Sequence, residues 1–195
     1  EVGSYSTSII PTSGATATRT ADVCNNAGTS ATFNSTQGVV FAEIAALFDE
    51  GTTADKWIAL SDGTSNNSVR VAFSGGANTI RAYLNVGGAA QADLTYTISD
   101  VTQYSKIGFK FKANDFSLWV DGTERATDTS GSVYSANTLN RLAFDNGGGG
   151  TGFQGKTKQL IVFDEALSDE ELSDLTGQVN LSFNNLATFY NYTIL

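Results

Sequence analysis

The stretch KIGFKFKANDFSLWVDGTERAT, residues 106–127, decides the fold class. Neighbouring side chains of a β-strand point to opposite faces of the sheet, so alternation of apolar and polar residues indicates a strand with one buried face. In Ile107–Phe111 the large apolar side chains share one face, whereas Lys110 lies on the other, exposed one. The pair Asp121-Gly122 signals a two-residue hairpin turn. This stretch therefore predicts three antiparallel strands in succession.

The middle strand of this stretch, Phe116–Val120, carries a tryptophan on the face that points away from the protein interior. Its large apolar side chains share the inner face, whereas Trp119 lies on the opposite one. An outward tryptophan is either exposed for a ligand or covered by a loop or a neighbouring subunit. Alternation leaves both interpretations open.

Apolar segments of strand length recur along the chain at intervals of about 10 to 15 residues, with Gly, Asn and Asp between them, which is typical of a sandwich. The segments are Val39–Phe48, Trp57–Leu60, Val69–Phe73, Ile80–Leu84, Leu94–Ile98, Ile107–Phe111, Phe116–Val120, Leu139–Phe144 and Leu160–Phe163. After the last segment, the capping box Ser168-Asp-Glu-Glu171 predicts a helix that ends near Gly177. The predicted fold is all-β: a two-sheet antiparallel sandwich with a short C-terminal helix.

Composition excludes several classes of function. The 195 residues contain no histidine and one cysteine, and the formal net charge is −9. Ser-His-Asp hydrolysis and His-ligated metals need histidine, and one cysteine permits neither an internal disulfide nor a Cys-ligated zinc site. The negative charge argues against nucleic acid as a partner, because phosphate backbones are bound by clustered Lys and Arg. No apolar run is as long as a membrane span, so membrane insertion is not expected.

Two stretches resemble the concanavalin A-like, laminin-G-like jelly-roll superfamily. Lys106–Thr127 is similar to that family's strand-turn-strand ending in an aromatic residue, an apolar residue and Asp-Gly. LAFDNGGGGTGFQGKTKQLIVFDEALSDEEL (Leu142–Leu172) resembles its late strand, glycine loop, final core strand and helix. The resemblance implies a jelly-roll domain over residues 22–177. It implies no single function, because the superfamily includes lectins, glycosidases, lyases and adhesion modules.

Both ends of the chain resemble phage proteins. The opening EVGSYSTSIIPTSGATATRTADV is similar to segments of phage tail and tail-fibre proteins, and the ending SFNNLATFYNYTIL is similar to the C-terminal tail of such virion proteins. Residues 1–21 are interpreted as an entry linker or edge strand from a preceding domain, and residues 178–195 as a C-terminal tail. The resemblance implies a virion or other extracellular surface, with virion or fibre subunits as partners in a homo-oligomer.

A sugar-binding groove is the first candidate site. Lectin grooves of this superfamily stack aromatic rings against sugars and hold hydroxyl groups with Asn, Asp and Arg. The candidates for binding surface glycans are outward side chains on strands that a jelly roll can place side by side, namely Trp119, Tyr83, Arg81, Asn85 and Arg70. In the competing interpretation a loop or a neighbouring subunit covers Trp119 and Tyr83. Trp57 can face either way, and a core position is favoured.

A structural calcium ion is the second candidate, because laminin-G-like and pentraxin-like relatives often hold calcium at the rim of the sandwich with carboxylates and carbonyls. Suitable oxygen atoms belong to Asp145 and Asn146, before the glycine loop, and to Asp62 in residues 61–67. Asp and Asn are also common turn formers, which is the competing interpretation. No other cofactor is expected.

Catalysis is not expected. The Glu-x-Asp-x-x-Glu string of laminarinase-type members is absent, and adjacent acids such as Asp49-Glu50 point to opposite faces of a strand. Alginate-lyase-type members rely on a Gln-x-His pattern, which a chain without histidine cannot supply. The predicted function is a non-catalytic carbohydrate-binding, attachment or decoration module of a phage virion or tail fibre. The alternatives are a purely structural virion subunit with its aromatic residues in an interface and a bacterial surface adhesin; a glycoside hydrolase or lyase is disfavoured.

Overall fold

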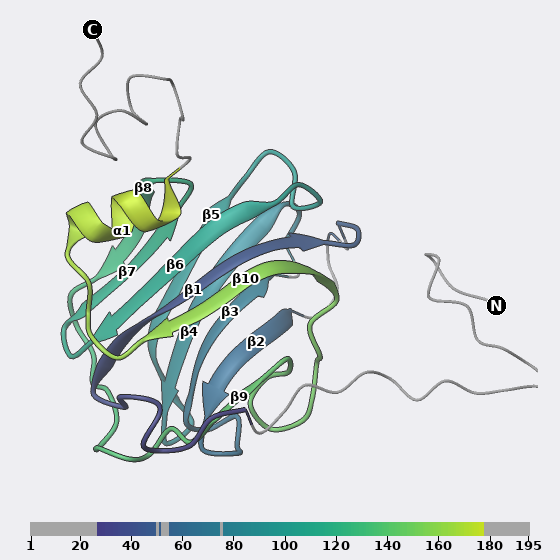
Figure 1. Cartoon of the computed structure of the whole chain (residues 1–195). Helices are drawn as coiled ribbons and strands as arrows, with labels where there is room; N and C mark the ends of the chain where they lie inside the picture. Colours follow the sequence, from purple (N-terminus) through teal and green to yellow (C-terminus); the bar gives the residue numbers. More distant parts are fainter. Residues whose placement is uncertain (1–26, 50, 52–54, 75, 178–195) are drawn as a thin grey trace, which may run out of the picture.

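The computed structural model describes residues 27–49, 51, 55–74 and 76–177, and its framework is two antiparallel sheets stacked face to face (Figure 1). The first sheet has the strand order β10 (Gly155–Phe163), β1 (Gln37–Ala46), β6 (Ser105–Lys112), β7 (Asp115–Val120) and β8 (Thr123–Asp128). The second has the order β5 (Ala89–Thr97), β4 (Thr79–Val86), β3 (Ser68–Phe73), β2 (Lys56–Ser61) and β9 (Arg141–Ala143). This architecture confirms the predicted two-sheet sandwich.

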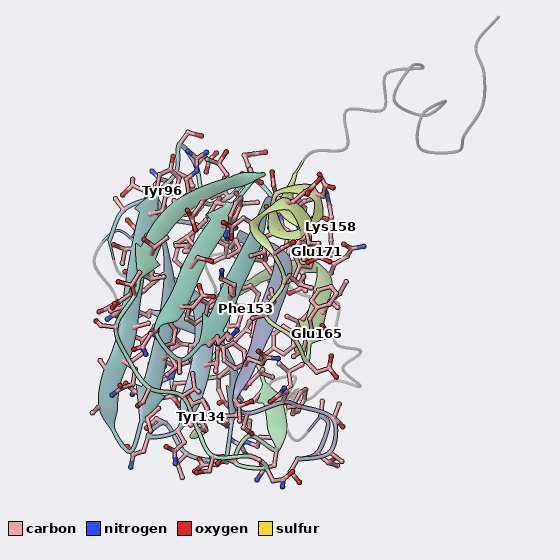
Figure 2. All side chains as sticks on the ribbon, turned by 90° about the vertical axis from the view of Figure 1, so that its left-hand side faces the viewer. Tyr96, Tyr134, Phe153, Lys158, Glu165 and Glu171 are labelled. Carbon is pink, nitrogen blue, oxygen red and sulfur yellow. The ribbon has the colours of Figure 1, made fainter. Side chains whose placement is uncertain are left out.

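The core lies between the two sheets and follows the alternation of the strands. In β1, Val40, Ala42 and Ile44 point inward and are buried. Val71 and Leu84 of the second sheet belong to the same buried cluster. Side chains from both sheets fill the space between them (Figure 2). Burial of each large apolar side chain in this layer contributes about 1.5–3 kcal/mol to stability.

The stretch that predicts the fold class forms the consecutive hairpins β6–β7 and β7–β8. Phe109 of β6 pairs with Leu118 of β7, and both point into the core. Asp121 and Gly122 connect β7 to β8 with φ angles of 50° and 80°. Positive φ at both positions is the geometry of a two-residue hairpin turn, and glycine adopts it without steric cost. The predicted three-stranded unit is confirmed.

Helix α1 (Asp169–Thr176) begins at the predicted capping box and lies on the outer face of the first sheet (Figure 1). The Ser168 hydroxyl accepts a hydrogen bond from the Glu171 backbone N–H, and the Glu171 carboxylate accepts one from the Ser168 N–H at 2.8 Å. Gly108 of β6 permits close approach of the helix, because a Cβ there would lie 3.1 Å from Thr176 Cγ2. The predicted C-terminal helix is confirmed.

The predicted end segments, residues 1–21 and 178–195, lie outside the described residues, as do residues 22–26 of the predicted domain. The strands of the two sheets fall between residues 37 and 163. Within the described part of the chain, no helix has the length and apolarity that crossing a membrane requires.

Candidate functional site

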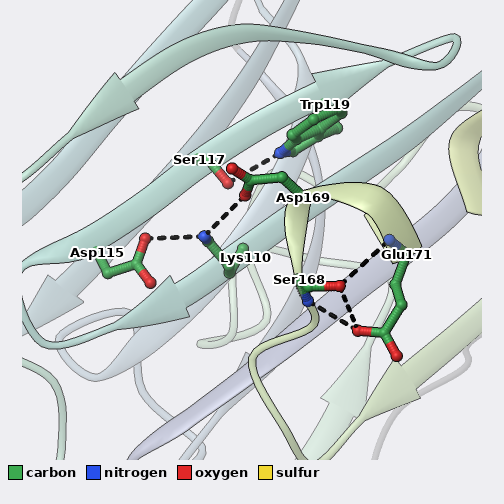
Figure 3. Close-up of polar contacts among 7 residues, drawn as sticks. All are labelled: Lys110, Asp115, Ser117, Trp119, Ser168, Asp169 and Glu171. Atoms are coloured by element: carbon green, nitrogen blue, oxygen red, sulfur yellow. Dashed lines mark hydrogen bonds and ion pairs between the residues drawn. The ribbon is translucent and has the colours of Figure 1, made fainter. Parts of the chain in front are cut away.

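The outward tryptophan of β7 is buried. Trp119 points away from the core between the sheets, as alternation predicts, but only 7% of it is exposed. It packs with Val39 of β1 and Leu172 of helix α1, and its Nε1 donates a hydrogen bond of 3.0 Å to the Ser117 hydroxyl (Figure 3). The prediction that Trp119 lines an exposed sugar groove is wrong, because a helix much later in the chain covers it.

Lys110 of β6, predicted on an exposed face, is buried beside this tryptophan. Its Nζ lies 2.9 Å from a carboxylate oxygen of Asp115 and 3.5 Å from one of Asp169, the first residue of the helix (Figure 3). Burial lowers the pKa of Lys110, but the hydrogen bond to Asp115 and the charges of Asp115 and Asp169 outweigh burial and raise the pKa above its ordinary value. Apolar and ionic contacts together therefore close this face.

The outer face of the second sheet carries the other predicted sugar-site residues. Arg70 of β3 pairs with Tyr83 of β4, and Arg81 shares the face of Tyr83. The centroids of the Tyr83 and Trp57 rings lie 6.0 Å apart. Each guanidinium lies over both rings, Arg70 at 5.3 and 5.5 Å and Arg81 at 5.6 and 4.8 Å from the Trp57 and Tyr83 centroids. We call Trp57, Arg70, Arg81 and Tyr83 the aromatic–arginine cluster.

Trp57 belongs to this cluster and not to the core position that the sequence favoured. Its neighbours on β2, Ile58 and Leu60, belong to the buried cluster between the sheets. Alternation therefore turns Trp57 to the outer face, where it is 5% exposed because the arginines lie over its ring. The signal that identifies this orientation is the apolar pair at positions 58 and 60.

Arg81 is held by two carboxylates. Its Nε and one Nη donate to the two oxygens of Asp93, each at 2.7 Å, and the other Nη donates to Asp55 at 2.7 Å. The hydrogen bonds to Asp93 raise the pKa of the Arg81 guanidinium above its ordinary value, and partial burial opposes this rise without cancelling it. The side chain of Arg81 is 25% exposed and that of Asp93 is 45% exposed. The most exposed charge at this site is therefore a carboxylate.

Arg70 and Asn85 position the loop of residues 61–67. They are 7% and 9% exposed, respectively. Both donate hydrogen bonds to the backbone carbonyl of Ser65, Asn85 Nδ2 at 3.2 Å. Arg70 Nε also donates to the Ser68 hydroxyl at 2.6 Å, and burial lowers the pKa of Arg70. These two predicted sugar-binding residues thus hold the loop of residues 61–67 in place beside the cluster.

The three residues predicted to hold calcium act as turn acceptors. Their hydrogen bonds run from Thr64 and Asn67 to Asp62, from Gly147 to Asp145, and from Gly148 and Gly150 to Asn146. The loop of residues 61–67 and the loop of residues 145–150 meet at the Gly147 carbonyl, which accepts hydrogen bonds from the Ser61 hydroxyl and from Arg141. Across the described residues, no three side chains of Asp, Glu, His or Cys gather as a metal site. These contacts favour the competing interpretation, in which Asp62, Asp145 and Asn146 are turn formers.

One protein family matches most of the described chain. The concanavalin A-like lectin/glucanases superfamily matches residues 44–173, from β1 to helix α1. The match includes strands of both sheets and both stretches that carry the resemblance in the sequence. No curated protein matches the chain in sequence.

Solved structures share the sandwich at low sequence identity. The Ruminococcus gnavus IT-sialidase CBM40 is 17% identical with a TM-score of 0.59, over 74% of this chain and 84% of that one. The same module bound to α2,3-sialyllactose is 16% identical with a TM-score of 0.55, over 72% and 83%. A leech intramolecular trans-sialidase is 19% identical with a TM-score of 0.58, over 75% of this chain and 24% of that one. At these identities the similarity shows the fold alone.

Proposed function

The chain belongs to the concanavalin A-like lectin/glucanases superfamily, and on that premise we propose that it is a non-catalytic carbohydrate-binding module whose site is the aromatic–arginine cluster. The observation that carries the proposal is the contrast between the outer faces: helix α1 covers Trp119, whereas Tyr83 and Arg81 are partly exposed. A tyrosine ring offers a flat apolar surface to a sugar ring, and the charged groups around it hydrogen-bond hydroxyl groups. The sugar-bound CBM40 of the same fold supports this class of ligand.

The carboxylates of the site support binding without catalysis. Asp55 and Asp93 each lie 2.7 Å from nitrogen atoms of Arg81, which stands between them. Glycoside hydrolysis places the glycosidic bond, and in inverting enzymes also a water molecule, between two carboxyl groups. Here a guanidinium fills that space. The pair therefore anchors Arg81 and leaves no room for the reacting atoms.

Glycan-array binding by the full chain tests the proposal, with Tyr83→Ala as the decisive variant. Loss of the ring is expected to weaken binding about tenfold or more, the equivalent of ~1.4 kcal/mol. Tyr104→Ala is the matched control, because Tyr104 is an exposed tyrosine outside the cluster and its loss leaves the site intact. Tyr83→Ala protein that keeps its melting temperature and binds glycans as tightly as the original chain overturns the proposed site.

We further propose that the module attaches to surface glycans or decorates the surface of a phage virion or tail fibre, alongside other copies of its subunit. The support is the resemblance of residues 1–23 and 182–195 to phage virion proteins. Several weak sites on one particle raise the overall affinity through effective concentration. A structural interface built on Trp119 loses its basis, because helix α1 covers that ring. Antibody labelling of purified particles in the electron microscope tests the location, and unlabelled particles overturn it.

A further inference from the structure

We propose that the aromatic–arginine cluster selects neutral glycans over glycans that carry a carboxylate, and that Asp93 sets this preference. The inference rests on the proposed function and names its class of ligand. It follows from the hydrogen bonds that the two guanidinium groups of the cluster already make.

The guanidinium of Arg81 already makes the hydrogen bonds with which it would bind an anionic ligand. Each of its three guanidinium nitrogens donates to a carboxylate oxygen, two to Asp93 and one to Asp55. Arginine recognises carboxylates through this same bidentate arrangement of two parallel N–H···O bonds. Asp93 therefore stands where the carboxylate of an acidic sugar would bind.

The second guanidinium of the cluster is turned away from solvent. Arg70 is buried and donates to the Ser68 hydroxyl and to the Ser65 carbonyl. The two arginines and the two carboxylates balance in charge, but the side chain of Asp93 is 45% exposed, against 25% for Arg81 and 17% for Asp55. An approaching ligand meets a negative group first, on a chain whose formal net charge is −9.

A neutral sugar can form hydrogen bonds with the same surface. Asp93 pairs directly with Tyr83 across β4 and β5, so the carboxylate and the ring are neighbours on one face. An ionised carboxylate has about four lone-pair sites, and Arg81 takes two of them. The remaining sites can accept hydrogen bonds from the hydroxyl groups of a sugar that packs on Tyr83.

The solved relative that contains α2,3-sialyllactose does not conflict with this assignment. It shares the sandwich with this chain at 16% identity, and a shared fold does not determine which sugar a site accepts. In this chain the most exposed charge of the site belongs to Asp93, whose hydrogen bonds to Arg81 fix its carboxylate beside the rings.

The experiment compares binding of the full chain to matched pairs of oligosaccharides that differ only by a terminal sialic or uronic acid. The neutral member of a pair is expected to bind at least tenfold more tightly at low salt. Because the difference is electrostatic repulsion, it should shrink as salt is raised from about 0.01 to 1 M. Asp93→Asn removes the exposed charge and should narrow the difference at low salt. Glu124→Gln, the same change of charge at an exposed position on the first sheet, should leave it unchanged.

The possible outcomes separate this inference from the proposed function. If acidic oligosaccharides bind the original chain as tightly as neutral ones, and Tyr83→Ala still weakens glycan binding, the inference is overturned and the proposed function stands. Binding of neither class by the original chain overturns the proposed function itself. If Asp93→Asn keeps its melting temperature and still prefers neutral oligosaccharides to the same degree, Asp93 does not set the preference. The same conclusion follows if the preference of the original chain does not change with salt.

Discussion

Both outer faces of the sandwich carry a tryptophan, and the chain covers the two rings by different means. Trp119 on the first sheet lies under helix α1 and packs with Leu172. Trp57 on the second sheet lies under the guanidinium groups of Arg70 and Arg81. The first ring is sealed by a helix with an apolar side, whereas the second is covered by charged side chains of its own sheet.

The difference assigns different physical roles to the two faces. Apolar burial under helix α1 adds to the free energy of unfolding, since it removes a large ring from water. The charged cover on the second sheet is a network of stacked and hydrogen-bonded side chains that holds Tyr83 and Arg81 in place. This order would lower the cost of fixing them in the proposed binding of a sugar. The first face serves stability, whereas the second carries the site that we propose for a sugar.

Trp119→Ala breaks the sealed face and has the largest expected effect on stability. Removing a buried tryptophan from close packing costs about 3–5 kcal/mol. The free energy of unfolding from urea titration should fall by this amount, whereas glycan affinity of the folded fraction should not change. Trp57→Ala is the counterpart on the other face. It removes the ring on which Arg70 and Arg81 lie and should therefore weaken glycan binding. A Trp119→Ala protein with full stability and lost glycan binding would reverse the two assigned roles.

Arg70→Ala tests whether the second face is held by its charged cover. The substitution removes a buried donor to the Ser65 carbonyl and the guanidinium that lies over Trp57, and should lower the free energy of unfolding by ~2 kcal/mol. Backbone amides of residues 61–67 should exchange hydrogen faster, because the loop loses one of its anchors. Arg70→Met keeps the apolar stem of the side chain and should recover part of the stability. Unchanged exchange of this loop in Arg70→Ala contradicts the anchoring role.

The fold was predictable because its signals are local. Alternation in β6 and β7, the Asp121-Gly122 turn and the capping box at Ser168 each depend on residues close together in the sequence. Such signals fix which residues form a strand, which side of it is apolar and where a helix begins.

The candidate site was predictable only in part, because alternation gives the direction of a side chain and not what covers it. Tyr83 and Arg81 point outward as predicted and stay partly exposed. Trp119 also points outward, but Leu172 reaches it from a helix that local pattern does not place. Asp93 lies opposite Tyr83 in the β4–β5 hairpin, whose register shifts between Leu84 and Asn85, and alternation alone does not predict such a shift.

Ser168→Ala sharpens the contrast by loosening the helix that seals the first face. Loss of a serine N-cap costs about 1 kcal/mol, and here the Glu171 N–H loses its acceptor. The melting temperature should fall modestly, and fluorescence of Trp119 should shift towards that of a hydrated indole before global unfolding. Ser135→Ala, at an exposed loop position, is the matched control. A variant whose helix and melting temperature equal those of the control shows that the cap does not hold the cover.

Alkaline pH should loosen the first face by a smaller amount. The pKa of Lys110 is raised above 10.5 in the folded chain, so its stabilising contribution is complete below the unfolded pKa and disappears as pH rises through the folded one. Between about pH 9 and 12 the original chain should lose more thermal stability than Lys110→Met, which has no charge to lose. Ionisation of Tyr134 affects both proteins alike, because burial raises its pKa in each. Parallel pH profiles for the two proteins contradict the ionic link to the helix.

Calcium is expected to have the smallest effect, because hydrogen bonds already join the loop of residues 61–67 to the loop of residues 145–150. The carboxylates of Asp62 and Asp145 accept hydrogen bonds within their own turns, and Arg141 donates to the carbonyl at which the two loops meet. Millimolar calcium should therefore leave the melting temperature unchanged, since only a ligand that favours the folded state raises it. The contrary result is a melting temperature that rises with calcium, in a way that Asp62→Asn and Asp145→Asn each abolish. That result would mean that the two turns open to bind the ion and that calcium, rather than hydrogen bonds alone, holds these loops.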